Sequence, residues 1–119
     1  MACDIIKIVD SVVYARIRDV IQIADIKTLE TVATKLIENG KKVRLLVIIE
    51  NFQGWKKAQE WGDVVFMMKH GNDIVKIAIV GDERWKEEAF LFTGKGFRKT
   101  EIEFFPPSLL KKAEAWVTL

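Results

Sequence analysis

Side chains able to carry acid–base or nucleophilic chemistry are few in this chain. His70 is the only histidine and Cys3 the only cysteine. One histidine excludes a catalytic pair of histidines or a multi-histidine metal site, and no zinc or redox spacing surrounds the cysteine. The best-placed carboxylates are Glu50 and Asp82, because each follows an apolar segment typical of a buried strand. A small enzyme using Glu50, Asp82 and His70 is one alternative, although no nucleophile, metal set or cofactor loop accompanies them.

Two similar junctions stand where these apolar segments end. The runs 43–49 and 76–80 lack period-2 alternation, which is typical of strands covered on both faces of a parallel sheet. Each run leads through polar residues and a glycine to a tryptophan that we expect to open a helix. Because ligands bind at the carboxyl ends of strands in open α/β sheets, these junctions predict a site. Its residues are Glu50, Phe52, Gly54, Trp55, Gly81, Asp82 and Trp85. The structural alternative is a helix cap at Asp82, glycine turns and core tryptophans.

A second group of aromatic residues lies in the helix predicted from residue 55 to about 70. Its apolar surface is broader than a surface helix needs, and it carries Trp55, Trp61, Phe66 and Met67. Large or deformable side chains of this kind suit an adaptable apolar pocket. The same surface could instead be packed core or the interface of a homodimer.

Charge and composition exclude several classes of partner. The chain has 19 basic and 17 acidic residues, a net charge of +2, which is too small to indicate nucleic-acid binding. Residues 94–99 combine two glycines with three cations, but they match neither a Walker A loop nor a dinucleotide fingerprint. We therefore predict no cofactor, no metal and no nucleic-acid partner.

Length and segment composition predict one cytoplasmic domain. The 119 residues fit a single domain over 1–119, and half of them are apolar. The lone cysteine fits a reducing compartment. We expect a soluble protein without integral membrane association, because no secretory signal pattern and no apolar run near ~18 residues is present.

The periodicities predict an α/β fold with the element order ββαβαβαβα. Two antiparallel strands over 3–9 and 12–18 meet at a turn at Asp10-Ser11, and a short connector follows over 20–23. Asp25 is the expected N-cap of the first helix and Asp82 that of the third. Further strands are expected from Val43 to near Glu50, over 74–80 and over 101–105, and a fourth helix after Pro106-Pro107. Right-handed crossovers make the last four strands mainly parallel, which gives a mostly parallel five-stranded sheet with four helices.

This element order, together with particular segments, resembles the SpoIIAA-like family over nearly the whole chain. The segments are VRLLVIIENFQGW at 43–55, WGDVVF at 61–66, KH at 69–70, IAIVGDERW at 77–85 and AEAW at 113–116. That family is similar in fold to the STAS domains of anti-sigma-factor antagonists and to CRAL-TRIO lipid carriers. The resemblance implies a non-enzymatic domain with an apolar crevice near the helices after the third and fourth strands, and a tendency to dimerise.

One functional feature of the STAS domains is not carried over. Regulated antagonists have a phosphorylatable Ser or Thr at the start of the helix after the central strand, whereas residues 50–55 contain no hydroxyl side chain. We therefore predict a binding module without that switch. It would engage a partner protein or a small apolar, lipid-like ligand through an aromatic crevice at the ends of the third and fourth strands. The alternatives are a homodimer with a structural or regulatory role and the small enzyme described above.

Overall fold

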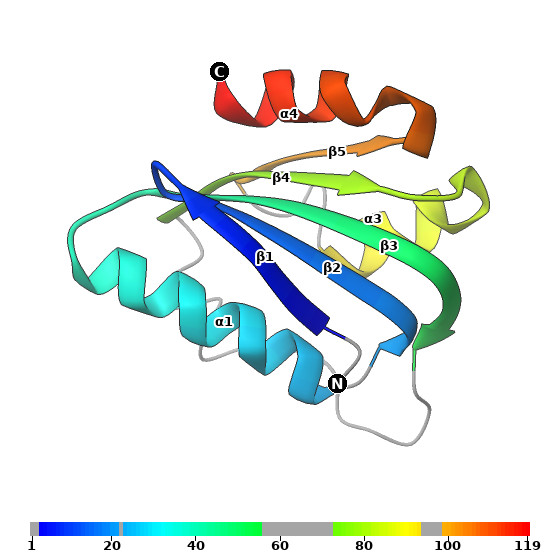
Figure 1. Ribbon diagram of the computed structural model, residues 1–119, viewed down its shortest axis with the longest axis horizontal. Helices are drawn as coiled ribbons and strands as arrows, with labels where there is room; N and C mark the ends of the chain where they lie inside the picture. Colours follow the sequence, from blue (N-terminus) through cyan, green and yellow to red (C-terminus); the bar gives the residue numbers. More distant parts are fainter. Residues whose placement is uncertain (1–2, 22, 56–72, 94–98) are drawn as a thin grey trace.

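The computed structural model describes residues 3–21, 23–55, 73–93 and 99–119 (Figure 1). Five strands and three α-helices make up this part of the chain. The strands are β1 (Cys3–Val9), β2 (Val12–Ile21), β3 (Val43–Trp55), β4 (Ile74–Val80) and β5 (Glu101–Phe105). The helices are α1 (Ile23–Glu38), α3 (Lys86–Thr93) and α4 (Leu110–Thr118), with 3-10 turns η2 (Glu83–Trp85) and η3 (Pro107–Leu109).

The strands form one sheet in chain order, β1-β2-β3-β4-β5. β1 pairs with β2 antiparallel, and the other neighbours are parallel, which confirms the predicted mixed α/β sheet. Asp10 and Ser11 join β1 to β2 with φ of 48° and 70°. Two successive positive φ values match the right-handed twist of a hairpin, and short polar residues tolerate them best.

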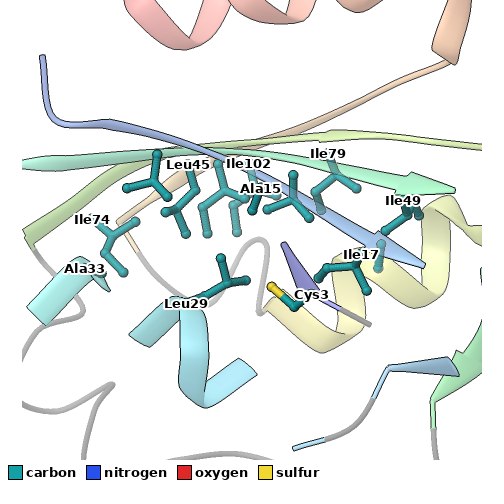
Figure 2. Close-up of a cluster of buried hydrophobic side chains, with 14 of the residues drawn as sticks. Cys3, Ala15, Ile17, Leu29, Ala33, Leu45, Ile49, Ile74, Ile79 and Ile102 are labelled. Atoms are coloured by element: carbon teal, nitrogen blue, oxygen red, sulfur yellow. The ribbon is translucent and has the colours of Figure 1, made fainter. Parts of the chain in front are cut away.

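The sheet has an apolar layer on each face. On one face, Leu29 and Ala33 of α1 and Ala89 of α3 pack against side chains of all five strands. Figure 2 shows Leu29 and Cys3 beneath strand side chains such as Leu45 and Ile79. On the other face, Ala113 and Val117 of α4 pack on a smaller cluster that includes Leu46. We refer to these as the α1/α3 face and the α4 face; Figure 1 shows α4 and α1 on opposite sides of the sheet.

Three local predictions were wrong. Trp55 does not open a helix, because β3 continues through it and pairs Gly54 and Trp55 with Val20 and Ile21 of β2. The predicted connector over 20–23 is therefore partly strand. Asp25 is not the N-cap of α1, because the helix begins at Ile23. The Asp25 carboxylate lies inside the first turn, where its negative charge interacts favourably with the helix dipole. Apart from Trp55, the helix predicted to run from 55 to about 70 lies outside the described residues.

Two cations of the sheet hold the carboxyl end of α4. Lys76 is buried, and its Nζ donates to the Trp116 carbonyl oxygen at 3.0 Å and lies 4.8 Å from the centroid of the Trp116 ring. Arg44 Nη1 donates to the carbonyl oxygens of Val117, at 2.8 Å, and of Leu119. The last carbonyls of a helix lack intrahelical donors and carry partial negative charge, so these contacts anchor α4 to β3 and β4.

Burial of Cys3 predicts a loss of stability at alkaline pH. Burial, and then the charges of Asp25 and Asp4, raise the pKa of the Cys3 thiol from 9.0 to about 11. Above about pH 9 the unfolded chain releases the thiol proton while the folded chain keeps it, so the free energy of unfolding falls until about pH 11. Urea unfolding across this range should show the chain losing up to about 2 kcal/mol more than Cys3→Ala, which lacks the thiol. Parallel curves for the two proteins would contradict the prediction.

Candidate functional site

The carboxyl ends of β2 and β3 are joined by an irregular pairing. Arg18 pairs with Glu50 and Val20 with Gly54, so residues 51–53 of β3 lie opposite Asp19 alone. Asp19 and Asn51 have φ of 56° and 47°, and Asn51 Nδ2 donates to Asp19 Oδ1 at 2.9 Å. Such a bulge re-aims the side chains of the longer strand. The polar residues that predicted a strand end instead mark a bulge within a longer strand.

The bulge brings Phe52 against Trp85 on the α1/α3 face. Phe52 is buried, Trp85 is partly buried, and their ring centroids are 4.7 Å apart at an interplanar angle of 76°. An edge-to-face pair of this kind adds about 0.5–1.5 kcal/mol to the stability gained by burial. Because Trp85 follows β4 and Phe52 belongs to β3, the contact joins the two predicted junctions.

Gly54 and Arg84 complete this group, which we call the Trp85 cluster: Phe52, Gly54, Arg84 and Trp85. Gly54 has φ of +102°, a conformation that favours glycine, and a Cβ there would lie at ordinary van der Waals distance, 3.7 Å, from Trp85 Cη2. Arg84 Cζ lies 5.3 Å from the Trp85 ring centroid, within cation–π distance. The cluster therefore combines apolar rings with an exposed cation.

Glu50 lies on the opposite face of the sheet from Phe52. Its neighbour Ile49 belongs to the α1/α3 core, so Glu50 points to the α4 face. There Arg16 Nε lies 2.9 Å from Glu50 Oε1, although its N–H is not aligned for a hydrogen bond, and Arg18 Nε lies 3.8 Å from Oε2. All three side chains are partly exposed, so each ion pair contributes at most about 1 kcal/mol. Glu50 thus belongs to a polar surface separate from the Trp85 cluster.

Asp82 and Gly81 each have a structural role that accounts for the residue type at that position. Asp82 Oδ1 accepts from the Arg84 backbone N–H at 3.0 Å, so the aspartate caps η2. Gly81 donates its N–H to the Phe105 carbonyl oxygen at 3.0 Å, and a Cβ on it would clash with the Ile49 side chain. Gly81 therefore links β4 to β5 and packs closely against the Ile49 side chain of β3.

Among the described connections, those after β4 and β5 leave for opposite faces: the first leads to α3 and the second to α4, with the Gly81–Phe105 hydrogen bond between them. The connection after β3 lies outside the described residues. The predicted site residues Trp61, Phe66 and Met67 lie outside the described residues, as does His70. The side chain of Trp55 is likewise not described.

Sequence reasoning missed three arginines around these groups. Arg16 and Arg18 alternate with buried residues of β2, and that alternation is the signal that places them together on the α4 face. Arg84 directly precedes Trp85, but a cation–π contact has no sequence signature of its own. Within the part of the chain that the structure describes, no group of three or more His, Cys, Asp or Glu side chains could hold a metal ion. None of the described helices is long and apolar enough to span a bilayer.

Comparison with known proteins identifies the fold family. The family model described as SpoIIAA-like matches residues 12–118. A solved structure of a DUF3478-family protein with a SpoIIAA-like fold, from Shewanella loihica PV-4, superposes with a TM-score of 0.65 at 21% sequence identity, covering 98% of this chain and 92% of that chain. None of the curated proteins matches the chain. The family match over most of the chain, together with the observed five-stranded sheet, shows that this chain belongs to the SpoIIAA-like family.

Proposed function

We propose that this domain is a non-enzymatic binding module and that the Trp85 cluster is its recognition surface. The observation that carries the proposal is the partly buried indole of Trp85, which meets Phe52 edge-on and has the guanidinium of Arg84 near its ring. An aromatic ring with one apolar and one charged neighbour suits an amphiphilic group that offers both an apolar chain and a polar end. A small lipid-like molecule fits this chemistry, and so does an apolar segment of a partner protein.

The contacts of the two candidate carboxylates support a binding role over catalysis. Asp82 accepts the Arg84 backbone N–H, and Glu50 lies between Arg16 and Arg18 on the other face of the sheet. General acid–base catalysis by a pair of carboxylates requires that both reach one substrate. Glu50 is paired with arginines of β2 and Asp82 with the backbone of η2, and these contacts account for both carboxylates without a shared substrate.

The proposal predicts a ligand response that depends on Trp85 and not on Trp116. Trp116 packs against Phe105 on the α4 face, 6.0 Å between ring centroids, and serves as the matched control. In titrations with fatty acids of increasing chain length, followed by tryptophan fluorescence and by NMR, the chain and Trp116→Phe should give the same saturating curve. Trp85→Ala should weaken binding about tenfold or more, because it removes the central aromatic contact.

Two results would contradict this assignment. Flat titrations over the whole panel would remove the lipid-like ligand, and equal binding by Trp85→Ala and the unaltered chain would move the site elsewhere. For the partner version, the unaltered chain and Trp85→Ala are used as paired baits in the same cell extract. A protein retained equally by both baits would not be using this surface.

A further inference from the structure

The exposed apolar side chains of the described residues are concentrated on one edge of the sheet. Ile6, Ile8 and Val9 of β1 are 43%, 47% and 47% exposed, and Leu119 is the only other large apolar residue this exposed in the part of the chain that the structure describes. β1 is the first strand in the sheet order, so among the described strands none pairs with the other side of its backbone. An edge strand with unpaired backbone groups and exposed isoleucines is a template for pairing with another strand.

The opposite edge of the sheet is built differently. In β5 the exposed residues Glu101 and Glu103 stand two positions apart and flank the buried Ile102. Antiparallel pairing of β5 with a second copy of itself would bring these like charges together, which is unfavourable. The composition of β5 therefore opposes self-pairing.

An irregularity in β1 gives the strand a self-complementary charge pattern. Asp4 pairs with Arg16 and Lys7 with Tyr14, and the register shifts between Ile5 and Lys7. Residues three apart in a regular strand point to opposite faces, but Arg16 and Tyr14 are two apart on β2 and share a face. The bulge therefore places Asp4 and Lys7 on the same face, where Lys7 Nζ lies 4.5 Å from the Tyr14 ring centroid.

We propose that β1 is an interface between two copies of this chain, paired antiparallel about a two-fold axis. In such a pair, directly opposite residues share a face, so Asp4 can lie opposite Lys7 of the partner subunit, and the symmetry repeats the contact. The two five-stranded sheets become one continuous sheet, and part of the exposed apolar surface of β1 is covered. This interface is separate from the Trp85 cluster and does not depend on the proposed ligand.

A charge-swap series tests the interface. Sedimentation from about 1 µM to about 1 mM should show a reversible monomer–dimer equilibrium. Asp4→Lys and Lys7→Asp should each raise the dissociation constant about tenfold or more, because each brings like charges face to face twice. The double variant Asp4→Lys/Lys7→Asp should return it to within about threefold of the original value. Glu87→Lys, an exposed charge reversal on α3, is the matched control and should leave dimerisation unchanged.

Amide hydrogen exchange on the unaltered chain provides a test that needs no substitution. Exchange of the β1 amides should slow as the protein concentration rises, while that of the β5 amides stays constant. Three results would overturn the proposal: a monomer throughout the range, a dimer with unchanged β1 exchange, or a folded double variant that does not regain dimerisation. If a single variant fails to fold by circular dichroism, the exchange experiment decides.

Discussion

Gly81→Ala should destabilise this domain by about 2 kcal/mol, because the new methyl group has no room. A Cβ at this position would clash with the Cγ1 and Cδ1 atoms of Ile49, whose side chain is buried in the α1/α3 core. The backbone cannot easily withdraw, since the Gly81 N–H is held by the Phe105 carbonyl oxygen at 3.0 Å. Chemical denaturation monitored by circular dichroism measures the loss.

A double-mutant cycle separates this clash from an effect on backbone conformation. Ile49→Ala alone should cost about 2–4 kcal/mol through the cavity it leaves. The double variant should be more stable than the sum of the single losses by at least about 1 kcal/mol, because the cavity accepts the methyl group. Gly40→Ala is the control: its φ is +81° and no atom lies within 4 Å of a Cβ there, so its cost should be purely conformational and additive with Ile49→Ala. An additive Gly81→Ala/Ile49→Ala pair would contradict the steric explanation.

Lys76→Met is expected to destabilise the domain by about 2 kcal/mol. The thioether side chain fills a similar volume but cannot donate to the Trp116 carbonyl oxygen, which Lys76 Nζ contacts at 3.0 Å. Replacing both members of a buried polar contact with apolar groups can be neutral, but here the acceptor is a backbone carbonyl that remains and keeps only the longer hydrogen bond from the Leu119 N–H, at 3.3 Å. The substitution also removes the positive charge at the carboxyl end of α4 and the cation over the Trp116 ring.

Lys112→Met, a substitution on α4 itself, is the matched control. Lys112 is exposed, so its replacement should change the free energy of unfolding by no more than about 0.5 kcal/mol. The loss from Lys76→Met should also persist at high salt, because buried contacts are screened far less than exposed ones. A Lys76→Met variant as stable as the Lys112→Met variant would show that the Lys76 contact does not hold α4.

Most of the fold could be predicted because its signals are local. The strand segments 3–9 and 12–18 and the turn at Asp10-Ser11 predicted the β1–β2 hairpin that the structure contains. Apolar runs separated by helical periodicity predicted the parallel order of the later strands. Arg44 and Lys76 could also have been interpreted from the sequence. Both are cations within strands that a helix covers, and a buried cation needs an acceptor, which here is a backbone carbonyl oxygen of α4.

The candidate site was less predictable because its geometry depends on pairing between strands. Asn51 and Asp19 adopt positive φ and bond to each other, so β3 extends beyond the polar residues that indicated its end. The bulge then sends Phe52 to one face while Glu50 faces the other. The residue types alone had placed Glu50 and Phe52 in one crevice. The register between β2 and β3, which the sequence does not reveal, puts the two side chains on opposite faces of the sheet.

The anchoring of α4 has a consequence for how the molecule is made. Among the described residues, α4 is the helix that covers Leu46, Ala78 and Val80, and it follows every strand in the chain. A nascent polypeptide leaving the ribosome can therefore form contacts between the earlier strands and α1 before α4 packs on the opposite face. Until residues 110–118 emerge, Leu46, Ala78 and Val80 lack the cover of α4 and are open to chaperones and to neighbouring chains.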